Sequence, residues 1–226
     1  MAAESGGAGQ GGTEPRKGTV EKRQALLRGA RTVFGRDGYT RAGIDEIAAE
    51  AGVSTRTLYN HFGGKENLFR TVLLDSAASV TAAYSALVAR HLGKVTDIEA
   101  DITALAREWM ERRAEHAPHM LLVRQIIAEG AHLPADVLEE WQRIGPRATT
   151  EAVRVHFVEL GARGLLALGD SDAGEAARYF TLLTAGSVTV DTFFGVVPMS
   201  QGEVDARVES GVRAFLRLYG GGRGGS

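Results

Sequence analysis

Apolar residues recur at helical spacing along most of this chain. In the segment VEKRQALLRGARTVFGRDGY, the apolar face of a first helix consists of Leu26, Leu27, Ala30 and Phe34. We expect that helix to stop at Gly35 and Gly38, because glycine accepts the left-handed conformation that closes helices. No alternating apolar and polar pattern extends beyond a few residues. The sequence therefore predicts no sheet.

The same spacing predicts a series of further helices. A short helix covers 44–51, a third begins at Ser54, and a long one extends from Lys65 to about His91. Later helices are expected near 95–115, 118–130, 134–144, 146–163, 173–195 and 201–219. Breaks are expected at Gly93, Pro118, Pro134, Gly145-Pro146, the LGDSDAG loop and Pro198. The β-branched run SVTVDTFF lies in a long apolar stretch, so we interpret it as buried helix. The predicted fold class is all-α.

A helix-turn-helix pattern follows the first helix. Gly52 permits the positive φ of a sharp reversal, and Val53 supplies an apolar plug for the turn. Ser54 is a good N-cap for the second helix of the pattern. In that helix Leu58 and Phe62 are four residues apart, so both point inward.

The other face of that second helix is polar. It consists of Thr55, Arg56, Tyr59 and Asn60, with Thr57 and His61 on its flanks. Arginine binds guanine with a fork of hydrogen bonds, asparagine does the same for adenine, and threonine offers a methyl group to thymine. Tyrosine, histidine and lysine reach phosphates instead. Lys65 opens the next helix, where backbone N–H groups and the helix dipole already favour an anion.

Charge is distributed unevenly along the 226 residues, although the formal net charge is only −2. Arg16 to Arg70 contains 11 Lys/Arg against 6 Asp/Glu, whereas the chain from Thr71 onward contains 15 against 20. A basic segment confined to one module is typical of a nucleic-acid interface. The alternative is chance clustering of charge on a solvated surface.

The residues from 38 to 69, GYTRAGIDEIAAEAGVSTRTLYNHFGGKENLF, closely resemble the DNA-binding domain of the TetR/AcrR family of transcriptional regulators. The resemblance covers roughly 20–69. It implies that DNA contacts are made by Thr55, Arg56, Thr57, Tyr59, Asn60, His61 and Lys65. Of these, Thr55, Arg56 and Asn60 are expected to contact bases, and the others phosphates.

One position departs from the family pattern. TetR-like proteins usually have a threonine followed by serine or threonine before the first helix of the motif, where the hydroxyl caps the helix and contacts phosphate. This chain has Ala42-Gly43 there. That phosphate contact is lost unless Thr40 or the Gly43 N–H replaces it.

The resemblance also implies the organisation of the remaining chain. We expect a disordered arm over 1–18, a DNA-binding domain over 19–65, a helical effector-binding and dimerisation domain over 66–219, and a flexible tail over 220–226. In this family the two helices before the last form a four-helix bundle with their partners, which places a homodimer interface on 146–163 and 173–195. Two-fold symmetry would match a palindromic stretch of double-stranded operator DNA.

A small-molecule effector pocket inside the larger domain is a further implication of the resemblance. The segment from Met120 to Val153 loosely resembles the C-terminal domain of AefR-like members, which does not fix the effector. Aromatic residues, methionines and a few polar groups typically line such pockets. The candidate wall residues are Trp109, Met110, His116, Met120, Arg124, Trp141, Phe180 and Phe194, and each of them alternatively belongs to the core.

Other function classes find little support in the sequence. The chain has no Cys, which excludes a disulfide framework and a thiol nucleophile. Pro118 interrupts the helix between His116 and His119, and no carboxylate-rich ligand set lies beside them. No P-loop, dinucleotide fingerprint or nucleophile elbow is found. We therefore expect no enzyme activity, metal, cofactor or membrane span, and a cytoplasmic location; an effector-blind regulator is the alternative function.

Overall fold

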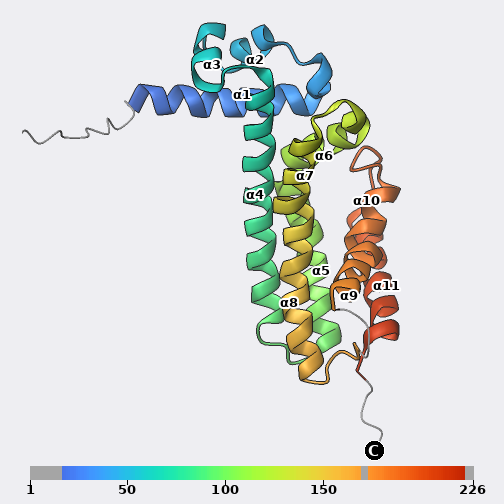
Figure 1. Cartoon of the computed structure of the whole chain (residues 1–226). Coiled ribbons are helices and arrows are strands. Elements are labelled where there is room, and N and C mark those ends of the chain that lie inside the picture. The colour runs from blue at the N-terminus through green and yellow to red at the C-terminus, as the bar shows by residue number, and fades with distance from the viewer. Residues whose placement is uncertain (1–16, 169–172, 222–226) are drawn as a thin grey trace, which may run out of the picture.

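Three helices lie across one end of a longer helical body (Figure 1). The computed structural model describes residues 17–168 and 173–221, so the expectations for 1–16, part of the LGDSDAG loop and the tail from 222 lie outside the described residues. The three helices are α1 (Lys17–Arg41), α2 (Ile44–Glu50) and α3 (Thr55–Phe62). In the described ranges the one β contact is an isolated bridge between Leu166 and Gly220, which confirms the all-α fold class.

The body consists of α4 (Lys65–Leu92), α5 (Ile98–Glu115), α6 (Ala117–Glu129), α7 (Ala135–Gln142), α8 (Ala148–Ala162), α9 (Ala173–Thr181), α10 (Ser187–Asp191) and α11 (Gln201–Tyr219). Helix α4 starts beside α3, crosses α1 and extends along the body beside α8 (Figure 1). The helices α9, α10 and α11 form the side of the body away from α4 (Figure 1). The long helix predicted from Lys65 is confirmed almost to the residue.

The first helix ends differently from the prediction. Gly38 has φ 83° and breaks α1, but Gly35 remains helical, so the expected stop at Gly35 is wrong. A Cβ at Gly35 would lie 3.3 Å from the Cβ of Leu121 in α6. Glycine at this position therefore favours the close approach of two helices rather than a turn.

The break predicted at Gly145-Pro146 is also wrong. Arg143–Arg147 forms a π-helical turn that joins α7 directly to α8. The hydroxyl of Thr81 donates to the Ile144 carbonyl at 2.9 Å, and that of Thr149 donates to the Gly145 carbonyl at 3.0 Å. These hydrogen bonds attach the π-helical turn to α4 and to the start of α8.

The helix predicted for 173–195 is shorter and less regular than expected. A π-helical turn, Leu182–Gly186, separates α9 from α10, and α10 ends at Asp191. Phe193 and Phe194 then have φ values of 46° and 59°, which no helix accommodates. The run SVTVDTFF is therefore helical only as far as Asp191.

Buried side chains form two clusters. The first joins α1–α3 to the first half of α4 and to α6 and α7, through residues such as Phe34, Leu58, Phe69 and Trp141. The second joins the rest of α4 to α5, α8, α9 and α11, through residues such as Phe157, Phe180 and Phe215. The first cluster therefore continues across the domain boundary expected near residue 65.

Helix α4 is the one helix in the described part of the chain that is long and apolar enough to cross a membrane. Its most apolar window is 44% buried inside the protein. Core helices of globular proteins satisfy the same criteria, so this is weak evidence for a membrane span.

Candidate nucleic-acid interface and cavity

The turn between α2 and α3 has the predicted geometry. Gly52 has φ 66°, and the Val53 N–H donates to the Ala48 carbonyl at 2.9 Å. The Ser54 hydroxyl accepts from the Thr57 N–H at 3.2 Å, which caps α3. Gly63, at φ 72°, ends the helix. The sequence therefore fixes both ends of α3.

The two faces of α3 are separated as predicted. Leu58 is fully buried and Phe62 is 7% exposed, so both belong to the first core cluster. Arg56 and Asn60 are exposed, and Tyr59 is 52% exposed on the same outward face. In the structure as described, Arg56 forms no salt bridge. Its guanidinium is therefore available to a partner outside the chain.

The remaining side chains of α3 are only partly exposed. Thr55, Thr57 and His61 are intermediate in burial. The Thr57 hydroxyl lies 2.9 Å from that of Ser54, and the His61 ring lies 6.2 Å from the ring of Phe62. These flanking groups are thus held close to the helix.

Lys65 is placed differently from the other candidates. Its ammonium group donates to the Ala42 carbonyl at 3.1 Å and to the Thr40 carbonyl at 3.4 Å, and lies 4.7 Å from the centre of the Tyr39 ring. Lys65 therefore joins the start of α4 to the segment between α1 and α2. It supports the position of the helix-turn-helix in this conformation.

The segment around Ala42-Gly43 has no side-chain cap for α2. Gly43 is the N-cap residue and Ala42 is buried. The Thr40 hydroxyl and N–H both donate to Oε2 of Glu129 in α6, at 3.2 and 2.9 Å. In this conformation the Thr40 hydroxyl and N–H are therefore used in hydrogen bonds to α6. Thr40 does not replace the hydroxyl that is missing at the start of α2.

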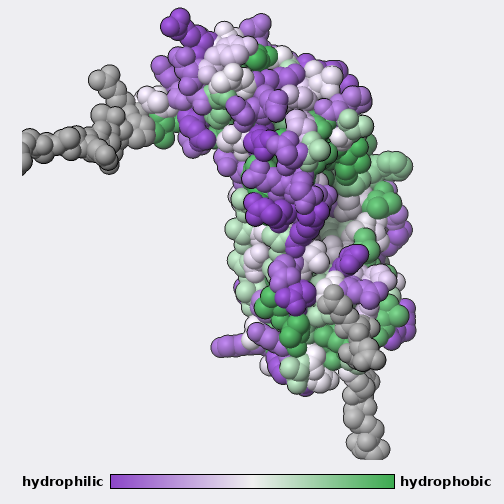
Figure 2. All heavy atoms as spheres, viewed as in Figure 1, coloured by the Kyte–Doolittle hydropathy of each residue, from purple (hydrophilic) through white to green (hydrophobic). Residues whose placement is uncertain are grey.

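The surface of the molecule differs between its two ends. Figure 2 shows hydrophilic side chains predominating over the end formed by α1–α3, whereas hydrophobic patches lie along the body. The outward residues of α3 belong to the hydrophilic end. Such a surface suits a partner that is itself charged.

A cavity of about 660 Å³ lies in the body between the two core clusters. Ala77 and Trp141 in its wall belong to the first cluster, and Tyr84 and Trp109 belong to the second. Three of the eight predicted wall residues, Trp109, Met120 and Trp141, line it.

The other five predicted wall residues do not line this cavity, and they are Met110, His116, Arg124, Phe180 and Phe194. Phe180 is buried against Phe157 and Phe215, and Met110 packs against the same cluster. The His116 ring lies edge-on to the Tyr84 ring, with 5.7 Å between the two ring centres. Residue type and the family resemblance identified these residues as candidates but did not separate core from cavity.

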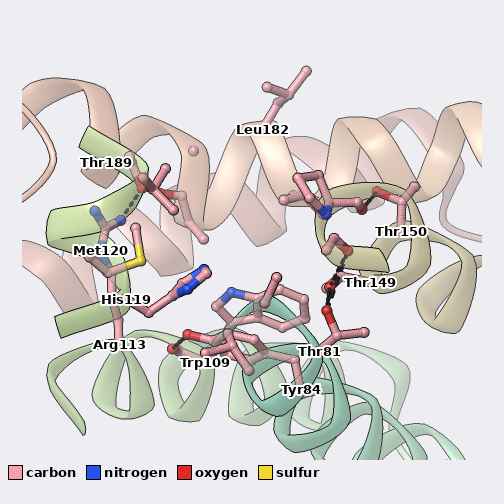
Figure 3. Close-up of a pocket in the computed structure, with 18 of the residues that line it drawn as sticks. Thr81, Tyr84, Trp109, Arg113, His119, Met120, Thr149, Thr150, Leu182 and Thr189 are labelled. Atoms are coloured by element: carbon pink, nitrogen blue, oxygen red, sulfur yellow. Dashed lines mark hydrogen bonds between the residues drawn. The ribbon is translucent and has the colours of Figure 1, made fainter. Parts of the chain in front are cut away.

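Several polar residues of the cavity were not predicted. Arg113, His119 and Thr189 gather at one end of it, and Thr81 and Thr149 lie at the other (Figure 3). The sequence contained one usable signal for Arg113, which lies four residues after Trp109 and thus on the same face of α5. The threonines come from three different helices, so no local pattern brings them together.

The titratable groups of the cavity are strongly affected by burial. Burial lowers the pKa of His119 to about 4, with further lowering by His116 and Arg31, so the ring is neutral at neutral pH. Its Nδ1 lies 3.1 Å from the Ser76 hydroxyl of α4. Burial likewise raises the pKa of Tyr84 to about 12. Burial also lowers the pKa of Arg113, which nevertheless keeps its charge.

These features define a class of protein. The helix α3 is capped at both ends and exposed on one face of a small three-helix bundle. This is the arrangement of the recognition helix in a helix-turn-helix DNA-binding protein. The model for the TetR family of bacterial regulatory proteins matches residues 26–72, and the model for the C-terminal domain of AefR-like transcriptional repressors matches 102–221, more than half of the chain. The chain belongs to the TetR family and is a DNA-binding transcriptional regulator.

Individual relatives agree with this assignment. The chain is 28% identical to the transcriptional regulator BetI 2 of Chromohalobacter salexigens, over 70% of this chain and 84% of that protein. It is 46% identical to the transcriptional activator FasR of Mycolicibacterium smegmatis over 30% of each chain. It is 34% identical to the transcriptional repressor AcnR of Corynebacterium glutamicum, over 42% of this chain and 49% of that one.

Solved structures share the whole fold. A TetR-family regulator from Mesorhizobium loti matches 92% of this chain and all of its own, with a TM-score of 0.79 and 27% identity. The flavonoid-responsive regulator FrrA matches 89% of this chain and 98% of its own, with a TM-score of 0.64 and 25% identity. Within the described residues no group of His, Asp and Glu side chains is arranged to hold a metal ion.

Proposed function

We propose that this regulator is a homodimeric repressor, released from a palindromic operator when a small molecule occupies the cavity. The observation that carries the proposal is the position of the cavity between the two core clusters. A ligand there contacts both clusters, so it favours the conformers in which they are spaced to admit it. The protein acts in the cytoplasm, where bacterial operators lie.

The outward face of α3 enters the major groove in this proposal. Arg56, Asn60 and Thr55 contact base edges, since their side chains match the donors, acceptors and methyl groups displayed there. Tyr59, with Thr57 and His61 on the flanks, contacts phosphates and sets the register. Lys65 contributes by holding the start of α4 against the α1–α2 segment, and it reaches phosphate only if its present contacts open.

Exposed apolar side chains on the helices expected at the interface support the homodimer. Val155 and Val158 of α8 are exposed, as is Leu182 between α9 and α10. Val190 of α10 and Phe193 just after it are 67% and 70% exposed. Exposed apolar residues gather at interaction surfaces, and α8 with α9–α10 is where the family resemblance places the partner subunit.

Two helices connect the cavity to the DNA-binding end. Ala77, Thr81 and Tyr84 of α4 line the cavity, and the same helix begins at Lys65 beneath α3. A ligand that moves this wall therefore shifts the start of α4. That shift changes the separation of the two recognition helices of the dimer, so that they no longer fit successive major grooves.

Helix α6 provides the second connection. His119 and Met120 line the cavity near its start. Near its end, Gln125 Nε2 donates to the carbonyls of Gly35 and Arg36 at 3.3 Å each, and Glu129 accepts the two hydrogen bonds from Thr40. The carboxyl-terminal part of α1 is thus held by a helix whose other end touches the ligand site.

Names of the relatives support this reading to different degrees. AcnR is named a repressor and FrrA is named flavonoid-responsive, which supports repression and a small-molecule effector. FasR is named an activator, so activation is the second candidate for the sign of regulation. An effector-blind regulator is the remaining alternative, and it is disfavoured by a cavity whose wall joins both clusters.

The test is a footprint on the DNA upstream of the protein's own gene, followed by binding measurements on the protected sequence. A homodimer predicts two symmetric half-sites, about one helical turn apart or a multiple of that. Arg56→Ala should weaken binding by about 10- to 100-fold and relax the base preference at one position per half-site, since a bidentate contact contributes about 1–3 kcal/mol.

Arg217→Ala is the matched control, because it removes the same charge from an exposed position of α11, at the opposite end of the molecule (Figure 1). It should leave the affinity within about twofold. An asymmetric footprint would contradict the homodimer, and an unchanged affinity of the folded Arg56→Ala variant would contradict the proposed interface.

A further inference from the structure

We infer that the cavity binds an amphipathic anion, with its carboxylate or comparable anionic head at Arg113 and an elongated apolar body along the cavity. This inference rests on the proposed role of the cavity as the effector site. It names the chemical class of that effector from the unsatisfied polar groups of the wall.

Arg113 has an incomplete set of partners. Its Nη1 donates to the Thr189 hydroxyl, while Nη2 is buried and has no hydrogen-bond partner. Among the described residues no carboxylate forms a salt bridge with it. A buried donor without a partner is costly, so an anion that accepts a hydrogen bond from Nη2 of the partly buried Arg113 recovers part of its desolvation penalty.

The one carboxylate among the described residues of the wall is already paired. Asp191 lines the cavity, but its carboxylate forms an ion pair with Arg207 of α11. His119, at the same end as Arg113, is neutral at neutral pH because burial lowers its pKa to about 4. Arg113 is thus the uncompensated charge of this end, and a cationic ligand would find no free acidic group here.

The opposite end of the cavity has different chemistry. The hydroxyls of Thr81, Thr149 and Thr150 all donate to backbone carbonyls, of Ile144, Gly145 and Pro146, at 2.9–3.0 Å. Their donors are therefore used, and they offer a ligand only lone pairs. Figure 3 shows these threonines far along the cavity from Arg113 and Thr189, with Trp109 and Tyr84 along the floor between them.

The middle of the cavity is apolar and aromatic. Val80, Tyr84 and Trp109 line it, and Tyr84 and Trp109 stack with 4.4 Å between ring centres. A volume of about 660 Å³ is in the range of cavities that enclose drug-sized ligands. One charged end and an apolar length together select a molecule with one anionic head and an extended hydrocarbon or aromatic body.

The chain provides its own reporter for a test. It contains two tryptophans, Trp109 and Trp141, and both line the cavity. Intrinsic fluorescence therefore reports occupancy directly on the full-length protein, without DNA. The probes are straight-chain carboxylates of eight to twelve carbons, each with the alcohol and the amine of equal length.

We expect each carboxylate to bind at least tenfold more tightly than its matched alcohol, and the amines to bind more weakly than the alcohols. Hydrogen bonds to a charged group contribute enough for a preference of that size. Arg113→Met, which keeps an unbranched apolar stem without the charge, should bind acid and alcohol equally. Retained binding of the alcohol shows that the cavity of that variant is intact.

Arg112→Met is the matched control, since the neighbouring Arg112 binds Glu108 outside the cavity. It should keep the preference for acids. The inference is wrong if the wild-type protein binds acids no better than alcohols, if no member of either series binds, or if Arg113→Met keeps the preference. Operator binding is measured separately, so a neutral molecule that releases the operator would overturn the ligand class while supporting the proposed function.

Discussion

The recognition helix α3 and the cavity differ in how completely their buried groups find partners within the protein. In α3 the apolar side chains of Leu58 and Phe62 are packed, and both helix ends are capped. Around the cavity, Nη2 of Arg113 and Nε1 of Trp141 are buried without a hydrogen-bond partner. Unpaired buried donors leave free energy that an added ligand can recover. One region is therefore complete without a ligand, and the other becomes complete only with one.

This contrast assigns different roles to the two regions. A DNA-binding surface must have its geometry before it binds DNA, since ordering it on binding would lower the affinity. A responsive site must instead favour one conformer only when it is filled, because a ligand shifts an equilibrium by its differential affinity for the two states. This difference between a preformed α3 and a ligand-dependent cavity can be tested with single substitutions.

The largest effect on stability is expected from truncating Leu58, the buried side chain that holds α3 against the core. Leu58→Ala should lower the free energy of unfolding by about 2–5 kcal/mol, because it opens a cavity in a fully packed site. Tyr59→Ala, next along the chain but 52% exposed, should cost less than about 0.5 kcal/mol and still weaken operator binding. Urea denaturation measures both. A loss below 1 kcal/mol for Leu58→Ala would show that α3 is not rigidly anchored.

The next effect concerns acid stability and His119. An unfolded histidine titrates near 6.5, whereas His119 in the folded protein has a pKa of about 4. Below pH 6.5 the unfolded chain therefore binds this proton first, and the stability that the neutral ring provides is lost progressively as the pH falls toward 4. The loss is about 3 kcal/mol at most, and it is complete below the folded pKa.

His119→Gln, which keeps a hydrogen-bonding group beside Ser76, removes this titration. Urea denaturation at several pH values should give wild-type and variant curves that are parallel above pH 7 and converge or cross between pH 6.5 and 4. Hydrogen bonds from Arg90, His91 and Arg112 lower the pKa of Glu108 to about 2, so this carboxylate also destabilises the fold as the pH falls below about 4.5. It does so equally in both proteins, and the difference between the two curves therefore reports His119. Parallel curves throughout would show that His119 is not buried as described.

The sequence predicted these two regions unequally, for a physical reason. The Gly52 turn, the Ser54 cap and the inward pair Leu58 and Phe62 depend on residues within a few positions of one another, so spacing alone determined them. The cavity depends on residues from α4 to α10, and periodicity cannot distinguish an inward residue in the core from one beside a void. Phe180 and Trp109 have the same pattern but different neighbours.

Errors of helix boundary have a similar origin. Pro146 and Gly35 are strong local signals for a break, and tertiary contacts override both. Thr81, 65 residues before Pro146 in the chain, binds the Ile144 carbonyl of the π-helical turn, and Gly35 packs closely against Leu121 of α6. Lys65 illustrates the same limit, since its position in the motif predicted phosphate contact but not its bonds to the Thr40 and Ala42 carbonyls.

The smallest effect, about 1 kcal/mol, is expected where the two regions meet. Glu129→Ala removes the acceptor of the Thr40 N–H and hydroxyl, so Gln125 remains as the α6 side chain that hydrogen-bonds to the end of α1, while the apolar packing between the two helices is unchanged. Hydrogen exchange at the Thr40 amide should become about fivefold faster. A ligand that releases the wild-type protein from the operator should change the operator affinity of the variant about fivefold less.

Glu129→Gln keeps one carbonyl acceptor for Thr40 and should lie between wild type and alanine in both measurements. Glu115→Ala, an exposed carboxylate of α5 paired only with Arg112 in the described structure, controls for the loss of charge. Unfolding free energies within about 1 kcal/mol of wild type would show that the change is local. Faster exchange at Thr40 with an unchanged ligand response would leave α4 as the connection that transmits binding, and α6 as a structural support.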